Sequence, residues 1–176
     1  WNPVTGCTKI SSGCKNCWAE KMAKRMAGRY GYPIRDPFQV TVHSADMVMK
    51  PFTWKKPRMV FVASMGDLFH SDVSDETLHD LFNIMEDPDN RHHLFLILTK
   101  RAKRMHYFLW ERWRESVPEN VWIGVSIEDQ TTAKKRVPYL IGTPSHKLFV
   151  SCEPLLGPID FEELPIPKVE TSRINY

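Results

Sequence analysis

Four short apolar runs recur along the chain, and each is followed by a polar loop. The runs are 59–63, 94–98, 121–125 and 147–150, and helix-like patterns separate them. Runs that are apolar throughout are typical of strands buried on both faces, whereas half-exposed strands alternate. Strand, loop and helix repeated about every 30 residues indicate parallel strands with right-handed crossovers. We therefore predict an α/β fold with a parallel sheet.

Helical patterns follow these runs. After the first run, Ser74 is a good N-cap, and Asp75 and Glu76 suit a first helical turn. After the third run, a helix is expected to begin near Thr132. Pro138 interrupts or restarts that helix, because proline has no N–H to donate to the preceding turn. These helices would supply the crossovers of the sheet.

The 176 residues, 42% of them hydrophobic, are enough for one compact domain. We expect this domain over 1–161, with an insertion or edge hairpin at about 31–57 and a C-terminal tail over 162–176. Residues 1–6 are expected to form the tail of a further strand. A helix is expected at about 16–29.

Overall composition limits the classes of protein to consider. The formal charge of +3, from 24 basic and 21 acidic residues, is too small to identify a nucleic-acid-binding protein. The sequence has no apolar stretch of about 18 residues and no charged-then-apolar leader. We therefore expect a cytoplasmic protein without a membrane partner. The oligomeric state stays open.

Basic residues cluster locally at 55–58, 100–104 and 134–136, with tryptophans close by in the sequence. Basic groups mixed with aromatic rings can bind phosphates and stack bases. Such runs are more often solvated helix faces. Two interpretations stay open: a nucleic-acid or nucleotide substrate, and an ordinary charged surface.

Cys7, Cys14 and Cys17 lie in one polar loop that runs into a helical pattern. Three protein ligands leave one position of a metal centre open, where a small molecule can bind. The spacing alone allows either a [4Fe-4S] cluster or a zinc ion. For zinc, the fourth ligand would be Cys152, a histidine or water. Four cysteines in a cytosolic-looking chain favour metal ligation over disulfides.

Polar side chains follow each apolar run, where a strand is expected to end. The carboxyl ends of parallel strands meet at one edge, and the cysteine loop is expected at the same edge. Ser64 and Asp67 could hold an ammonium group there. Glu128 could bind ribose hydroxyls, and Lys100 or Arg101 a carboxylate. The predicted cofactor-binding residues at this edge are Ser64, Asp67, Thr99, Lys100, Ser126, Glu128, Ser151 and Glu153.

Six segments carry specific motifs: WNPVTGC at 1–7, GCKNCWAE at 13–20, SMGDLFH at 64–70, LTKR at 98–101, NVWIGVS at 120–126 and SCEPLLG at 151–157. With these motifs the chain resembles a phage-associated protein family of largely unknown function that is related to radical S-adenosylmethionine (SAM) enzymes. The resemblance covers nearly the whole chain up to about Phe161. It implies a partial (β/α) barrel of parallel strands, whose pattern in the family extends beyond both ends of this chain.

The resemblance also implies a radical SAM-type enzyme. A [4Fe-4S] cluster on Cys7, Cys14 and Cys17 would bind SAM at its open iron and cleave it reductively, with an electron donor such as a flavodoxin or ferredoxin. The host cytoplasm would be its location if a phage encodes it. Most radical SAM enzymes have three residues between the first two cysteines and an aromatic residue before the last. Here six residues intervene, and the aromatic residue, Trp18, follows Cys17 instead. Stacking of adenine on Trp18, from this different position, is a further expectation.

A rival interpretation comes from a different class of protein. The chain would then be a zinc-stabilised module that binds nucleic acid or recruits a partner without catalysis. Binding of SAM and release of 5′-deoxyadenosine separate the two interpretations.

Overall fold

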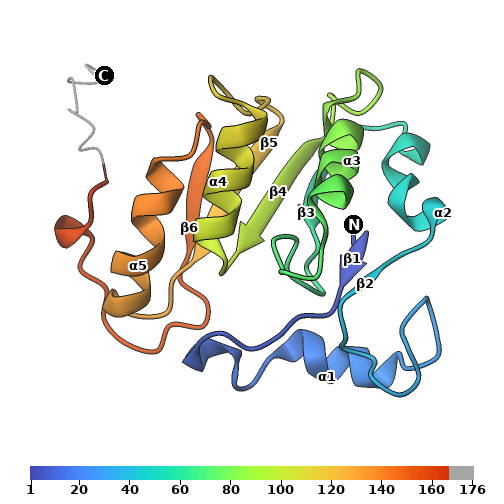
Figure 1. Ribbon diagram of the computed structural model, residues 1–176, viewed down its shortest axis with the longest axis horizontal. Coiled ribbons are helices and arrows are strands. Elements are labelled where there is room, and N and C mark those ends of the chain that lie inside the picture. Colours follow the sequence, from blue (N-terminus) through green and yellow to red (C-terminus); the bar gives the residue numbers. More distant parts are fainter. Residues whose placement is uncertain (167–176) are drawn as a thin grey trace.

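In the computed structural model, which describes residues 1–166, the centre of the chain is a four-stranded parallel sheet (Figure 1). Its strands are β3 (Met59–Val62), β4 (Leu94–Thr99), β5 (Val121–Ser126) and β6 (Leu148–Ser151), in the order β3-β4-β5-β6. Neighbouring strands pair in parallel throughout. The four apolar runs are these four strands, so the predicted α/β class and parallel sheet are confirmed.

Three helices, α3 (Asp75–Glu86), α4 (Ala102–Arg112) and α5 (Gln130–Ile141), connect these strands and lie on one face of the sheet (Figure 1). The Ser74 hydroxyl accepts a hydrogen bond from the backbone N–H of Thr77, so Ser74 is the predicted N-cap of α3. Pro138 neither ends nor restarts α5, which continues through it. The proline lies on the solvent side of the helix, where water can bind the carbonyl that loses its N–H partner.

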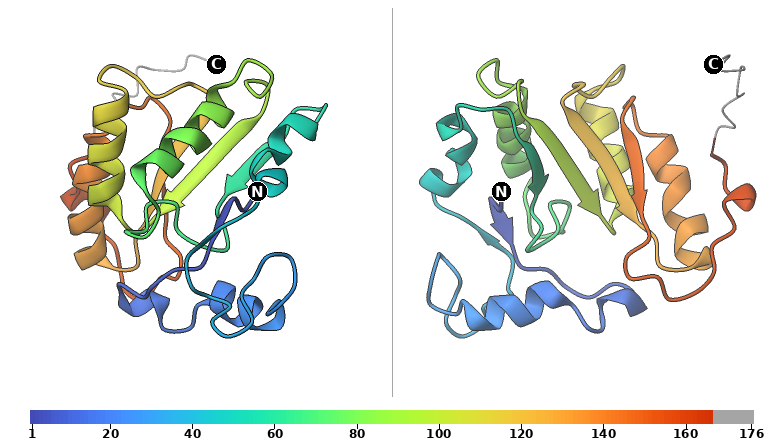
Figure 2. Two further views of the ribbon diagram at one scale, coloured as in Figure 1. Left: turned by 45° about the vertical axis from the view of Figure 1, so that its right-hand side comes forward. Right: turned by 180° about the vertical axis from the view of Figure 1, so that it is seen from behind.

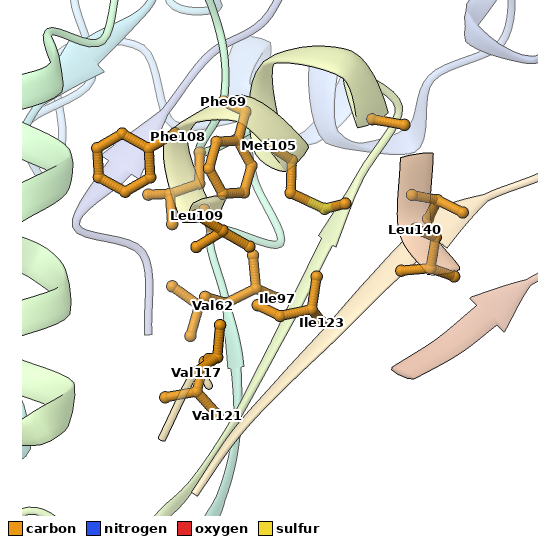
Figure 3. Packing of buried hydrophobic residues seen from close by; sticks show 14 of the residues in the cluster. Val62, Phe69, Ile97, Met105, Phe108, Leu109, Val117, Val121, Ile123 and Leu140 are labelled. Carbon is orange, nitrogen blue, oxygen red and sulfur yellow. The ribbon is translucent and has the colours of Figure 1, made fainter. Parts of the chain in front are cut away.

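The hydrophobic core lies between the sheet and these helices. Figure 3 shows Val62, Ile97 and Ile123 from three adjacent strands close to Met105 and Leu109 of α4. All five side chains are almost completely buried. Each such burial stabilises the fold by about 1.5–3 kcal/mol, so this layer holds the strand ends in fixed positions.

The opposite face of the sheet is open among the described residues. The view from behind in Figure 2 shows the strands in front of α3, α4 and α5. On β3, Val60 and Val62 are buried, whereas Met59 is 70% and Phe61 is 41% exposed. The expectation that the strands are covered on both faces is therefore wrong for this face. An apolar run reports the apolarity of both faces, not whether another layer of the molecule covers each of them.

The N-terminal segment forms a separate two-stranded sheet that is joined by one isolated bridge to the chain after β3. Strand β1 (Val4–Thr5) pairs antiparallel with β2 (Thr41–Val42), and Gly6 forms a parallel bridge with Gly66. At Gly6, where φ is +83°, a Cβ atom would lie 2.0 Å from the carbonyl oxygen of Gln39, so only glycine fits. The predicted front strand is thus present, and the cysteine loop leaves it at the carboxyl edge.

The remaining elements are short. The expected N-terminal helix is α1 (Trp18–Arg25), shorter than 16–29. The segment 31–57 contains β2, α2 (Ala45–Val48) and a 3₁₀ turn at Lys50–Thr53. Other 3₁₀ turns are Ser12–Cys14 and Phe161–Glu163.

Leu164 is buried in the core, so the folded part continues past 161, and the rest of the expected tail, 167–176, lies outside the described residues. None of the helices within residues 1–166 has the length and apolarity needed to cross a membrane.

Candidate functional site

The cysteine loop passes along the carboxyl edge of the parallel sheet. In Figure 1 the dark blue segment after β1 runs beneath the ends of the strands before α1 begins. Among its contacts are two residues that follow strands: Arg101, which is itself bound to Asp67, and Glu128. The structure thus brings together the loop and the polar strand ends, as the sequence predicts.

Glu128, which follows β5, holds the second half of the loop. It is fully buried. Its Oε1 accepts a hydrogen bond from the Ser11 hydroxyl at 2.7 Å, and its Oε2 accepts one from the Gly13 N–H at 3.0 Å. Lys100 Nζ lies 2.5 Å and Arg136 Nη1 3.4 Å from Oε1. Four donors therefore bind this carboxylate, three of them at Oε1 and one at Oε2.

The protonation of Glu128 follows from these contacts. Burial alone would raise its pKa, but the hydrogen bonds from Lys100, Ser11 and Gly13 lower the pKa to about 2. The carboxylate is therefore charged at neutral pH. A buried charge requires such partners, so breaking one of them weakens the attachment of the loop.

Asp67, which follows β3, holds the first half of the loop through Arg101. Asp67 Oδ2 accepts from Arg101 Nη1 at 2.9 Å, and Oδ1 accepts from the Thr99 hydroxyl at 2.6 Å. The same guanidinium donates from Nη1 to Cys7 Sγ at 3.2 Å and from Nη2 to the Thr8 hydroxyl at 3.0 Å. Arg101 therefore joins two strand ends to the first cysteine.

His70 completes this half of the site. Its Nδ1 accepts a hydrogen bond from the N–H of Asp72, so Nε2 carries the proton and donates to the Thr8 hydroxyl at 2.7 Å. Burial, followed by the charge of Arg101, lowers the pKa of His70. A neutral His70 thus orients Thr8 next to Cys7, and its role here is to position the loop.

The three thiols are half-buried and free of disulfides. Burial and the charge of Asp67 raise the pKa of Cys7, and the charge of Cys14 adds to this rise. Burial opposes ionisation of Cys14 as well, but hydrogen bonds from Ser11 and nearby backbone N–H groups outweigh it and lower that pKa. Cys17 is the N-cap residue of α1 and packs on the small apolar cluster beneath that helix.

The chemistry of this donor set can be compared with what each metal centre requires. Within residues 1–166, no three His, Cys, Asp or Glu side chains converge on a position for one metal ion. A zinc ion needs that convergence, because its ligands lie about 2.0–2.3 Å away. In a [4Fe-4S] cluster each thiolate binds a different iron. The ligands therefore lie around a larger body than a single ion. The loop supplies three free thiols, and the cations Arg101 and Lys100 lie close to Cys7 and Cys14.

The other predicted cofactor-binding residues divide into three groups. The Ser64 hydroxyl donates to Asn2 Oδ1 at 3.1 Å, so it binds the N-terminal segment. Ser126 and Ser151 are register partners on β5 and β6, at the same edge as the loop. Glu153 and Trp18 are exposed, and the exposed fraction of Trp18 is 59%.

A family model matches residues 1–170. The chain belongs to DUF5131, described as a protein of unknown function. This family description names no activity and no ligand. No curated protein and no solved structure gives a significant match in the corresponding searches.

Several contacts of this DUF5131 site were not predicted from the sequence. Ser11 and Gly13 bind Glu128 from 117 and 115 residues away in the chain. Arg136 was part of a basic run, but it is buried and also donates to the Ser126 carbonyl at 2.7 Å. A signal existed in the sequence for Arg136, because it falls on the apolar stripe of its helix beside Val137.

Proposed function

We propose that the chain is a radical SAM-type enzyme built on a partial (β/α) barrel. A [4Fe-4S] cluster on Cys7, Cys14 and Cys17 would leave one iron open for SAM. The observation that carries the proposal is the attachment of the cysteine loop to the carboxyl edge, through Glu128 and through Arg101. In parallel α/β folds this edge is where ligands bind and react.

When bound and reduced, the cluster supplies an electron that cleaves a carbon–sulfur bond of SAM. An electron donor such as a flavodoxin or ferredoxin belongs to this proposal. The chain's own residues would hold the loop, orient SAM and exclude water. Fixing the loop before the cofactor arrives removes an ordering cost from binding.

The polar groups at this edge would have different roles. Glu128 and Asp67 carry protein donors on both carboxylate oxygens, so they would position the loop and set the local charge. Ser126 and Ser151, on adjacent strands, would bind SAM from the open face. Thr99 and Lys100 would act through the two carboxylates that they contact.

Two groups would complete the SAM site from the exposed side of the loop. Glu153 is exposed and has no hydrogen-bonding partner among residues 1–166, so it is free to accept from the ammonium or ribose groups of SAM. Trp18 follows the third cysteine and presents an exposed ring on which adenine could stack.

Anaerobic reconstitution with iron and sulfide tests the proposal. We expect a [4Fe-4S] content of one per chain, and 5′-deoxyadenosine release on addition of SAM and a reductant. The variant C7A/C14A/C17A should lose both. Cys152→Ala is the matched control, because Cys152 is a half-buried cysteine outside the loop, and it should keep both.

A protein that takes up stoichiometric zinc and refuses iron and sulfide would favour the non-catalytic zinc module instead. In that case neither SAM affinity nor 5′-deoxyadenosine release would be found, and the enzyme proposal would be wrong.

A further inference from the structure

A cavity of about 680 Å³ lies beside α4 and α5, next to the cysteine loop. Its lining includes residues at the start of α4 and residues of α5, and it reaches Ile10 of the loop. α4 and α5 are neighbours on the helical face of the sheet (Figures 1 and 2). The cavity therefore adjoins the candidate site from the helical side and is distinct from the open face of the sheet.

The lining is strongly basic. Six of its residues are Lys or Arg, against two acids, Asp75 and Glu111. Four of these cations already have partners: Lys100 and Arg136 bind Glu128, Arg101 binds Asp67, and Arg104 binds Asp75 together with the His70 and Val73 carbonyls.

The other two cations, Lys103 and Lys135, differ from these four. Both are exposed, and neither has a hydrogen-bond or ion-pair partner within residues 1–166. One stands on the first turn of α4 and the other on α5. Among the described residues, the cavity is therefore lined by two unpaired lysines from neighbouring helices against one unpaired acid, Glu111, and this excess of positive charge favours an anion as its ligand.

The backbone adds to this positive charge. Lys103 lies in the first turn of α4, whose N-cap residue, Arg101, makes no side-chain cap. The N–H groups of a first helical turn lack partners within the helix, and the helix dipole favours an anion there. Together with the two lysines, this turn can hold a phosphate group.

The same cavity has aromatic walls. Tyr107 is 57% exposed, and Tyr139 is half-buried opposite it, with ring centroids 6.4 Å apart and planes at 59°. Exposed tyrosine rings beside unpaired lysines are the combination that binds a base next to its phosphate. A simple inorganic anion would contact the lysines alone, whereas a nucleotide would contact the rings as well.

We propose that this cavity binds a nucleotide unit, either free or within a single strand, with its phosphate at Lys103 and Lys135 and its base against Tyr107 and Tyr139. Binding itself does not depend on a metal centre. The further step, that this unit belongs to the substrate, rests on the proposed function, since the cavity meets the cysteine loop at Ile10.

Fluorescence anisotropy on the metal-free protein tests the binding. The two probes are labelled AMP and a labelled single-stranded oligoadenylate. The variant K103E/K135E should weaken binding at least tenfold. With the strand it should also lower the salt slope by about 0.7, for the one phosphate whose neutralisation is lost. Tyr107→Leu should weaken binding about tenfold by removing stacking.

The control K55E/K56E makes the same charge change at exposed lysines away from the cavity, and it should alter the affinity less than twofold. Circular dichroism melts check that each variant folds. Tight binding of AMP alone assigns a free nucleotide, and tight binding of the strand alone assigns nucleic acid.

Absence of binding by either probe would overturn the inference. So would equal losses in both double variants, or equally strong competition by polyglutamate. Because these assays need neither iron nor SAM, a failed reconstitution leaves the inference standing, and failed nucleotide binding leaves the enzyme proposal standing.

Discussion

The two halves of the cysteine loop are attached to the sheet in different ways. The first half is held mainly by side chains: Arg101, itself bound by Asp67, contacts Cys7 and Thr8, and His70 contacts Thr8 as well. The second half is bound directly by a fully buried carboxylate, Glu128. The first attachment can reorient as the guanidinium moves, whereas the second fixes the loop backbone. Cys14 should therefore be placed more rigidly than Cys7.

The largest expected effect is that of Glu128→Gln. This change keeps the shape of the side chain but leaves Lys100 and Arg136 without their anion. Breaking a buried ion pair from one side costs about 3 kcal/mol, so the free energy of unfolding measured in urea should fall by about that amount. Hydrogen exchange should accelerate at residues 11–14 more than at Thr8.

The control for this change is Glu119→Gln, at an exposed glutamate without a partner among the described residues. It should alter the unfolding free energy by less than about 0.5 kcal/mol. If the two variants lose the same stability, Glu128 does not anchor the loop.

Arg101→Ala should have the next largest effect. It removes one charged hydrogen bond from Asp67, which keeps those from Thr99 and from the backbone N–H groups of Phe69 and Lys100. We expect a loss of about 2 kcal/mol in unfolding free energy.

Faster exchange should be confined to the first half of the loop, around Thr8. Arg114→Ala, at an exposed arginine, is the control. Faster exchange at residues 11–14 as well would mean that the two attachments are one unit.

Gly13→Ala tests the rigidity of the second half of the loop by adding a single carbon atom. A Cβ at this position would lie 2.5 Å from Glu128 Cδ, and that carboxylate is held by four donors. The resulting overpacking should cost about 1.5 kcal/mol. Gly157→Ala is the control, since its Cβ would have its nearest neighbour at 3.6 Å. Equal stability of the two variants would show that the second half of the loop yields as easily as the first.

A pH dependence tests the same carboxylate. The pKa of Glu128 is about 2 in the folded chain, against an ordinary value of 4.5. Its contribution to stability is therefore complete above pH 4.5 and is lost as the pH falls from 4.5 towards 2.

The difference in unfolding free energy between the wild type and Glu128→Gln should accordingly stay constant from pH 7 to 5 and shrink below. His70 acts in both proteins and cancels in this difference. A gap that does not change down to the lowest pH at which both fold would contradict the assignment.

Much of the fold was predictable because it depends on local patterns. Apolar runs located β3 to β6, and the N-cap Ser74 located the start of α3. The predicted break of α5 at Pro138 was wrong, because the effect of a proline depends on which side of the helix faces water. The open face of the sheet was missed for a similar reason: the sequence of β3 reports apolarity, not the presence of a covering layer.

The candidate site was predictable only in part. Polar residues at strand ends share an edge for topological reasons, so Asp67, Glu128 and the cysteine loop could be placed together. Their partners could not be predicted, because Ser11 meets Glu128 across 117 residues of sequence. Arg136 was hidden in a basic run that resembles an exposed surface. Such pairings depend on how the loop crosses the edge, which no local pattern encodes.

The most direct test of the central claim is anomalous diffraction from crystals of anaerobically reconstituted protein, recorded at the iron and zinc absorption edges. The account predicts an iron peak bonded to the sulfurs of Cys7, Cys14 and Cys17 at the carboxyl edge, with one iron free of protein ligands. A zinc peak at this loop, or iron bound elsewhere in the molecule, would contradict it.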